Sequence, residues 1–115
     1  CQSVFGAVYA WTNRDYYYPG QHAIMFVYAD THSKVDAKGL SIAVYRDGNL
    51  FGEFEPVACA PKSHIYFSKG FFCLYRFGVG DLGEYSADAL FEGMVVEQGI
   101  AKFSVIKKPF WKWFW

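Results

Sequence analysis

The stretch Asp81–Phe91 reads "DLGEYSADALF" and joins a glycine-containing turn to a run of alternating residues. From residue 84 onward, the larger or apolar residues recur at every second position. They are Tyr85, Ala87, Ala89 and Phe91. This period of two places them on one face of an extended strand.

Part of the same region also fits a helical spacing, through Ala87, Leu90, Phe91, Met94 and Val95. A helix there would hold Gly93 in its interior, at a cost of about 1 kcal/mol relative to alanine. The strand is the favoured interpretation, with the helix as its alternative.

Similar short runs recur along the chain about every ten residues, separated by turn residues. Asp47-Gly48 is a strong hairpin signal, and further turns are expected at Glu92-Gly93 and Gln98-Gly99. The run at 22–29 is apolar on both parities, which predicts a central strand buried on both faces. The expected strands are 4–11, 22–29, 40–45, 50–59, 65–67, 71–77, 84–91, 94–97 and 100–106. This pattern predicts an all-β, antiparallel sandwich or small barrel of about seven to nine strands.

The segment Asp81–Ala87 resembles the D-x-G-x-Y-x-C stretch of immunoglobulin-like domains, where a corner tyrosine bonds back to the backbone. The resemblance implies an immunoglobulin-like β-sandwich in which Tyr85 is the corner tyrosine and Ala87 stands in the place of the cysteine. The usual cysteine on the run 22–29 and the usual tryptophan on 40–46 are absent. The resemblance therefore implies a fold and no activity.

The composition narrows the possible partners. Formal net charge is zero and no basic run occurs, which disfavours a nucleic-acid partner. Aromatic residues make up 22% of the chain, more than a core of this size readily hides, so part of the aromatic surface is expected to be exposed. Exposed patches of this kind mark contacts with a protein, a glycan or a membrane.

The three cysteines make an odd number. With Cys1 otherwise engaged, Cys59 and Cys73 are expected to form a disulfide, and two buried free thiols are the alternative. A chain that begins with cysteine resembles a mature bacterial lipoprotein, which implies a lipid attached to Cys1; a fragment boundary and a different mature secreted protein are the alternatives. Gln2 in second position resembles members sent to the outer membrane. The localisation expected from this resemblance is the cell envelope, lipid-anchored at the outer membrane.

Two aromatic segments are candidate contact sites. Residues 1–108 are expected to form the sandwich domain, and residues 109–115 a separate aromatic tail after Pro109 interrupts the last strand. The tail is the candidate principal contact with a partner protein; the alternatives are packing in the protein's own core or as a last edge strand, and a membrane surface. The tyrosine loop is the candidate second contact, and packing of its rings over the end of the sandwich is the alternative. The candidate contact residues are Phe110, Trp111, Trp113, Phe114 and Trp115, together with Tyr16, Tyr17 and Tyr18.

Catalytic and metal-binding patterns are weak. His22, His32 and His64 lack metal-ligand spacing, and the glycine-rich Gly78–Gly83 reads as a turn because no βαβ unit surrounds it. We therefore expect no enzyme, cofactor or metal site. The expected function is a binding, accessory or scaffold subunit of a membrane-associated complex, which docks on another envelope protein. A carbohydrate-binding module and an inhibitor that occludes a receptor or an enzyme are the alternatives.

Overall fold

The structure is a computed structural model that describes residues 5–31, 39–61 and 70–109, in which the elements are nine β-strands. Within these residues, no helix has the length and apolar character needed to cross a membrane. The strands are β1 (Phe5–Thr12), β2 (Tyr16–Tyr17), β3 (His22–Thr31), β4 (Leu40–Arg46), β5 (Asn49–Phe54), β6 (Ala58–Pro61), β7 (Gly70–Gly78), β8 (Gly83–Phe91) and β9 (Met94–Val105).

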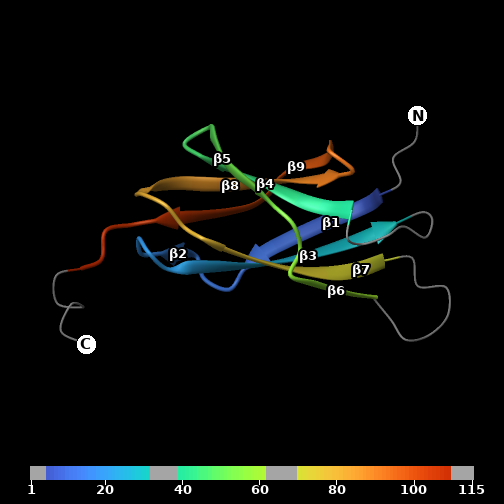
Figure 1. The fold of residues 1–115 in the computed structure, drawn as a ribbon, viewed down its shortest axis with the longest axis horizontal. Helices are drawn as coiled ribbons and strands as arrows, with labels where there is room; N and C mark the ends of the chain where they lie inside the picture. Colours follow the sequence, from blue (N-terminus) through green and yellow to red (C-terminus); the bar gives the residue numbers. More distant parts are fainter. Residues whose placement is uncertain (1–4, 32–38, 62–69, 110–115) are drawn as a thin grey trace.

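The strands form two sheets that lie in two layers (Figure 1). One sheet has the order β1-β3-β7-β6 and the other the order β2-β9-β8-β4-β5. Neighbouring strands are antiparallel, except that β2 runs parallel to β9. This is the strand order of an immunoglobulin-like sandwich, with strands A, B, E and D in one layer and G, F and C in the other. The prediction of an all-β, immunoglobulin-like fold is confirmed.

Tyr85 occupies the corner that leads into β8. Its side chain is 1% exposed, and its hydroxyl donates to the carbonyl oxygen of Asp81 at 2.8 Å. The turn needs glycine at position 80 because a Cβ there would lie 2.7 Å from the ring of Phe51 and 3.2 Å from the Tyr85 hydroxyl. Tyr85 therefore has the geometry that the resemblance implied for a corner tyrosine.

Two hairpins follow the turn signals in the sequence. Asp47 and Gly48 both have positive φ, 51° and 86°, as do Glu92 and Gly93, at 52° and 84°. Two consecutive residues in the left-handed region are characteristic of the turns whose twist matches that of antiparallel strands. The hairpin prediction at residues 47–48 is confirmed, and the helical alternative for residues 87–95 is wrong because this segment forms β8, a turn and β9.

Four strand predictions need correction. The expected strand 50–59 is broken at Pro56, which lacks an N–H group, and the chain there passes from β5 in one sheet to β6 in the other. The expected strands 94–97 and 100–106 are joined in the single strand β9 (Met94–Val105), since the expected turn at Gly99 is a bulge whose N–H donates to the Asp88 carboxylate at 2.9 Å. The tyrosine loop contains the short strand β2. Only one parity of β3 is fully buried, and the other is half-buried on the outer face of its sheet.

The core lies between the sheets and is rich in rings. Its largest fully buried side chains include Tyr75 on β7 and Tyr85 on β8, together with Leu40, Ile42 and Val44, which β4 places on its inner face. Each buried ring removes about 150–250 Å² of surface from water, so a few of them stabilise a domain of this size substantially.

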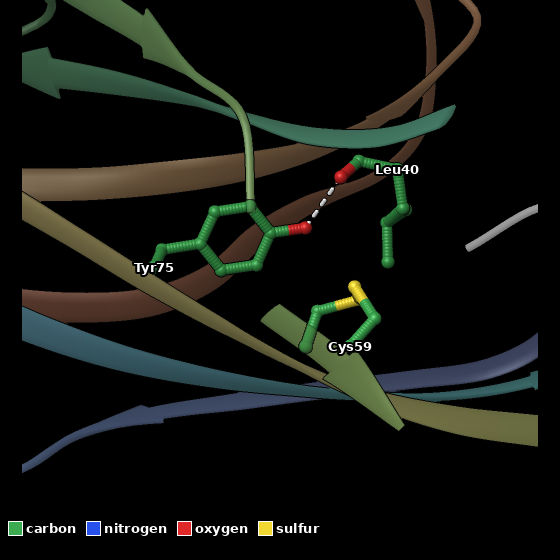
Figure 2. The surroundings of a disulfide bond; sticks show 4 residues. Leu40, Cys59 and Tyr75 are labelled. Carbon is green, nitrogen blue, oxygen red and sulfur yellow. Dashed lines mark hydrogen bonds between the residues drawn. A yellow bond between two sulfur atoms is a disulfide. The ribbon is translucent and has the colours of Figure 1, made fainter. Parts of the chain in front are cut away.

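Tyr75 connects the two layers beside the disulfide (Figure 2). Its hydroxyl crosses the core and donates to the carbonyl oxygen of Leu40, the first residue of β4, at 2.5 Å. The predicted disulfide joins Cys59 to Cys73, which are paired residues of β6 and β7 with Cα atoms 4.1 Å apart. The covalent bond therefore lies within one sheet, and the Tyr75 hydrogen bond spans the two.

Burial raises the pKa of Tyr75 above its ordinary value of 10.0. Because the folded state holds this proton more tightly than the unfolded chain, the stabilisation is complete below pH 10 and is lost as the pH rises above it. Replacing Tyr75 with phenylalanine is expected to cost roughly 1–2 kcal/mol at pH 7, since the Leu40 carbonyl loses its donor. The variant should also lose stability less steeply between pH 9 and 11 than the unmodified protein.

Urea unfolding at a series of pH values measures both effects. Tyr9→Phe, at a tyrosine that is 60% exposed, is the matched control and should follow the unmodified protein. Equal alkaline slopes for Tyr75→Phe and the unmodified protein would contradict the assignment.

Candidate functional site

The outer face of the four-stranded sheet carries a cluster of aromatic side chains. On β3 and β7, one parity fills the core and the other points outward, away from the second sheet. Antiparallel register aligns the outward residues in rows that cross the strands. We call this surface the aromatic face, and its rings are Tyr9, Trp11, Phe26, Tyr28 and Phe72.

The rings of the aromatic face stand against one another across the strands. In the first row, Tyr9 pairs with Tyr28 at a centroid distance of 6.2 Å, and Tyr28 contacts Phe72 at 4.9 Å. In the second row, Trp11 pairs with Phe26 at 5.8 Å. The Tyr28 hydroxyl is also held, since it donates to the Asp30 carboxylate at 2.5 Å. The aromatic face is therefore an ordered surface of mutually supported side chains.

Large parts of this surface are open to solvent. Tyr9 is 60% exposed, Trp11 47% and Phe72 43%. Single exposed apolar residues are ordinary on proteins, but a contiguous group on one sheet face marks an interaction site.

A hollow of about 590 Å³ adjoins the aromatic face at the end where β3 begins and β7 ends. The sheet supplies Ile24 and Leu74, and Val57 adds a third apolar side chain. Leu74 pairs with Phe26, so the hollow is continuous with the second aromatic row. We call it the basic hollow, and its polar lining residues are Asn13, Arg14, Gln21, His22 and Arg76.

The charges of the basic hollow are not neutralised within the described part of the chain. Its lining contains no carboxylate. The two ion pairs that join described residues to each other both belong to Arg46, with Asp47 at 3.9 Å and Asp81 at 3.8 Å, in the other sheet and its adjoining turn. Arg14 and Arg76 therefore supply two guanidinium groups that have no ion-pair partner among the described residues.

The structure exposes some of the predicted contact residues and buries another. Tyr16 is 44% exposed and its ring lies 5.7 Å from that of Tyr18, so these two form a small aromatic surface. Tyr17 is a correction: it is 2% exposed, because β2 joins β9 and turns this ring edge-on to Phe103 in the core. Cys1 and the tail residues Phe110, Trp111, Trp113, Phe114 and Trp115 lie outside the described residues.

The residues that the structure describes contain no group of three or more His, Cys, Asp or Glu side chains arranged to hold a metal ion. His32 and His64 lie outside them.

Sequence reasoning did not identify the aromatic face or the basic hollow. One signal was present, since the rings of β3 share one parity while Ala23, Met25, Val27 and Ala29 share the other. Small and flexible residues on the inner parity leave room for rings from the opposite sheet, which turns Phe26 and Tyr28 outward. Arg14 and Arg76 carried no such signal because only the pairing of β3 with β7 brings their segments together.

Comparison with known proteins adds little. No family model matches the chain, and no curated protein matches it. Among solved structures, the chain is similar to the CARDB domain of the PF1109 protein from Pyrococcus furiosus, determined in complex with di-metal ions. The TM-score is 0.45 at 16% sequence identity, over 91% of this chain and 96% of that one. The immunoglobulin-like fold of the chain is shown by its strand order and its corner tyrosine.

Proposed function

We propose that the protein is a non-catalytic binding module that docks on another protein through the aromatic face. The observation that carries this proposal is the juxtaposition of exposed, ordered rings with two guanidinium groups that have no ion-pair partner among the described residues. Tyrosine, tryptophan and arginine are the residues most enriched where interfaces hold their binding energy. An accessory or scaffold subunit of a larger assembly uses a surface of this kind.

The ring geometry favours a protein over a glycan. A sugar-binding platform needs ring faces that are open to the ligand, because the sugar stacks on the face of the ring. Here Trp11 and Phe26 are nearly parallel, with 23° between their planes, and Tyr9 and Tyr28 with 16°. Each of these rings is therefore stacked on a neighbour that covers part of its face, and this arrangement suits packing against apolar side chains of a protein partner.

The cell envelope is the compartment that we propose. A disulfide such as Cys59–Cys73 is typical of proteins in oxidising compartments, and this supports a location outside the cytoplasm. A lipid on Cys1, with attachment to the outer membrane, belongs to the same proposal. Intact mass of the protein extracted from membranes tests it, since a lipid adds its mass and a free Cys1 thiol would contradict the anchor.

Site-specific photocrosslinking tests the docking surface. A benzoylphenylalanine introduced in place of Tyr9 should form a discrete adduct with a second polypeptide in cells that make the protein. The matched control replaces Lys102, which is exposed on the outer side of β9 in the other sheet, and should form no such adduct. In addition, Trp11→Ala should lower the adduct yield about 30-fold, because truncating a central interface ring costs about 2 kcal/mol.

Three results would contradict the proposal. The first is the same adduct from both positions, and the second is no adduct from position 9. The third is an adduct at position 9 that contains polysaccharide and no second polypeptide, which would favour the carbohydrate-binding alternative.

A further inference from the structure

We infer that the basic hollow receives the carboxylate of an acidic side chain that lies within an apolar segment of the partner protein. This inference rests on the proposed docking function and adds the chemistry of the partner to it. Three properties of the hollow support it: its charge, the direction of its hydrogen-bonding groups and its continuity with the aromatic face.

The charge that the described residues give the hollow is positive. Arg14 and Arg76 are both exposed and both line the hollow, whereas no Asp or Glu of the described part of the chain does. Arginine holds carboxylates through paired, charge-assisted hydrogen bonds, which are about twice as strong as neutral ones. The positive charge of the hollow therefore favours a ligand with an anionic group at this position.

The two amide side chains of the lining are oriented as donors. The Oδ1 atom of Asn13 accepts a hydrogen bond from the Tyr17 hydroxyl. Similarly, the Oε1 atom of Gln21 accepts the backbone N–H of Tyr18 at 2.9 Å. Each amide oxygen therefore already accepts one hydrogen bond from the protein, and each amide also carries two N–H donors. Together with the two arginines, these donors suit a ligand that offers acceptor atoms.

The apolar residues in and around the hollow indicate which kind of molecule carries the anionic group. Ile24, Leu74 and Val57 give it an apolar lining, and the Trp11–Phe26 row continues from it. A free inorganic anion would leave these apolar surfaces exposed to water. A nucleic acid would require a longer series of cations to follow its phosphates, and the chain has no basic run. An aspartate or glutamate flanked by apolar residues satisfies both the donors and the apolar surface.

The size of the hollow agrees with this occupant. At about 590 Å³, it lies within the range of roughly 300–1,000 Å³ that ligand pockets occupy. It therefore has room for an acidic side chain together with neighbouring atoms of its segment, while the flanking apolar residues rest on the aromatic face.

Charge reversal in the full chain tests the inference. The photocrosslinker at position 9 is combined with Arg14→Glu and Arg76→Glu, or with Lys102→Glu as the matched control on the other sheet. The double reversal should lower the adduct yield by about tenfold or more, since it opposes a carboxylate with like charge. The control should leave the yield unchanged. Circular dichroism confirms that each variant is folded, which is expected because all three positions are exposed.

The crosslinked partner provides the second measurement. Mass spectrometry of the adduct should place the crosslink within a few residues of an aspartate or glutamate. Changing that residue to lysine should restore the adduct with the reversed variant.

The outcomes separate the two proposals. An adduct that persists undiminished after charge reversal overturns the acidic occupant and leaves the docking function intact. If the crosslinker at position 9 forms no adduct even when Arg14 and Arg76 are unchanged, the docking function is overturned, and the inference with it.

Discussion

Replacing Tyr85 with alanine is expected to destabilise the domain by about 3–5 kcal/mol, the range for removing a large buried ring. The ring stacks on Phe103 at 5.1 Å with 18° between the planes, and it meets Phe51 edge-on at 5.4 Å. Its hydroxyl fixes the turn that connects β7 to β8 through the Asp81 carbonyl. Small domains are stable by about 5–15 kcal/mol, so this one change removes a large share of the total.

A graded series separates the ring from the hydroxyl. Tyr85→Phe should cost about 1–1.5 kcal/mol, because only the hydrogen bond to Asp81 is lost. Leu82→Ala, at an exposed residue of the same connection, is the control and should change the free energy of unfolding by less than about 0.5 kcal/mol. Urea unfolding monitored by tryptophan fluorescence gives all three values. A loss below about 1 kcal/mol for Tyr85→Ala would show that the corner does not hold the sandwich together.

Removing the disulfide is expected to have the second largest effect. Cys59 and Cys73 are 14 positions apart, and a bridge of that span stabilises a protein by about 3 kcal/mol through its effect on the unfolded chain. Replacing both cysteines with alanine should therefore lower the melting temperature by roughly 10–20 °C. A reductant should lower the melting temperature of the unmodified protein by a similar amount.

Two comparisons make this prediction specific. Reductant should have no further effect on the double alanine variant. Ala58→Ser, an exposed substitution in the same strand, should melt with the unmodified protein. A double variant as stable as the unmodified protein would mean that the bridge contributes nothing beyond what β6 gains from pairing with β7.

Local patterns in the sequence were sufficient for much of the fold. The Asp47-Gly48 turn and the alternation that begins at Tyr85 are encoded within a few residues, and both predictions hold. The strand break at Pro56 is also encoded locally, but its consequence is not, because passage from one sheet to the other depends on what the other sheet offers. The bulge at Gly99 similarly depends on the Asp88 carboxylate of the neighbouring strand.

The aromatic face could not be predicted from the sequence for a physical reason. Both parities of β3 are apolar, so hydropathy alone could not tell which one faces the core. The opposite sheet decides this, since its large rings leave space for Ala23 and Ala29 and not for Phe26. Tyr17 shows the same limit, because a tyrosine in a polar loop becomes a core residue once β2 pairs with β9.

The passage of the chain from β1 to β2 has a mechanical consequence. β1 is bound to β3 in one sheet, and a few residues later β2 is bound to β9 in the other, where the Tyr17 carbonyl accepts the Ile106 N–H at 3.0 Å. The one disulfide among the described residues lies within a single sheet, so it does not cross-link the two layers. Only the segment Asn13–Asp15 connects β1 to β2, so the two sheets cannot separate unless β1 dissociates from β3 or β2 dissociates from β9. Arg14 lies in this segment, so a partner bound in the basic hollow would also help to hold the two sheets together.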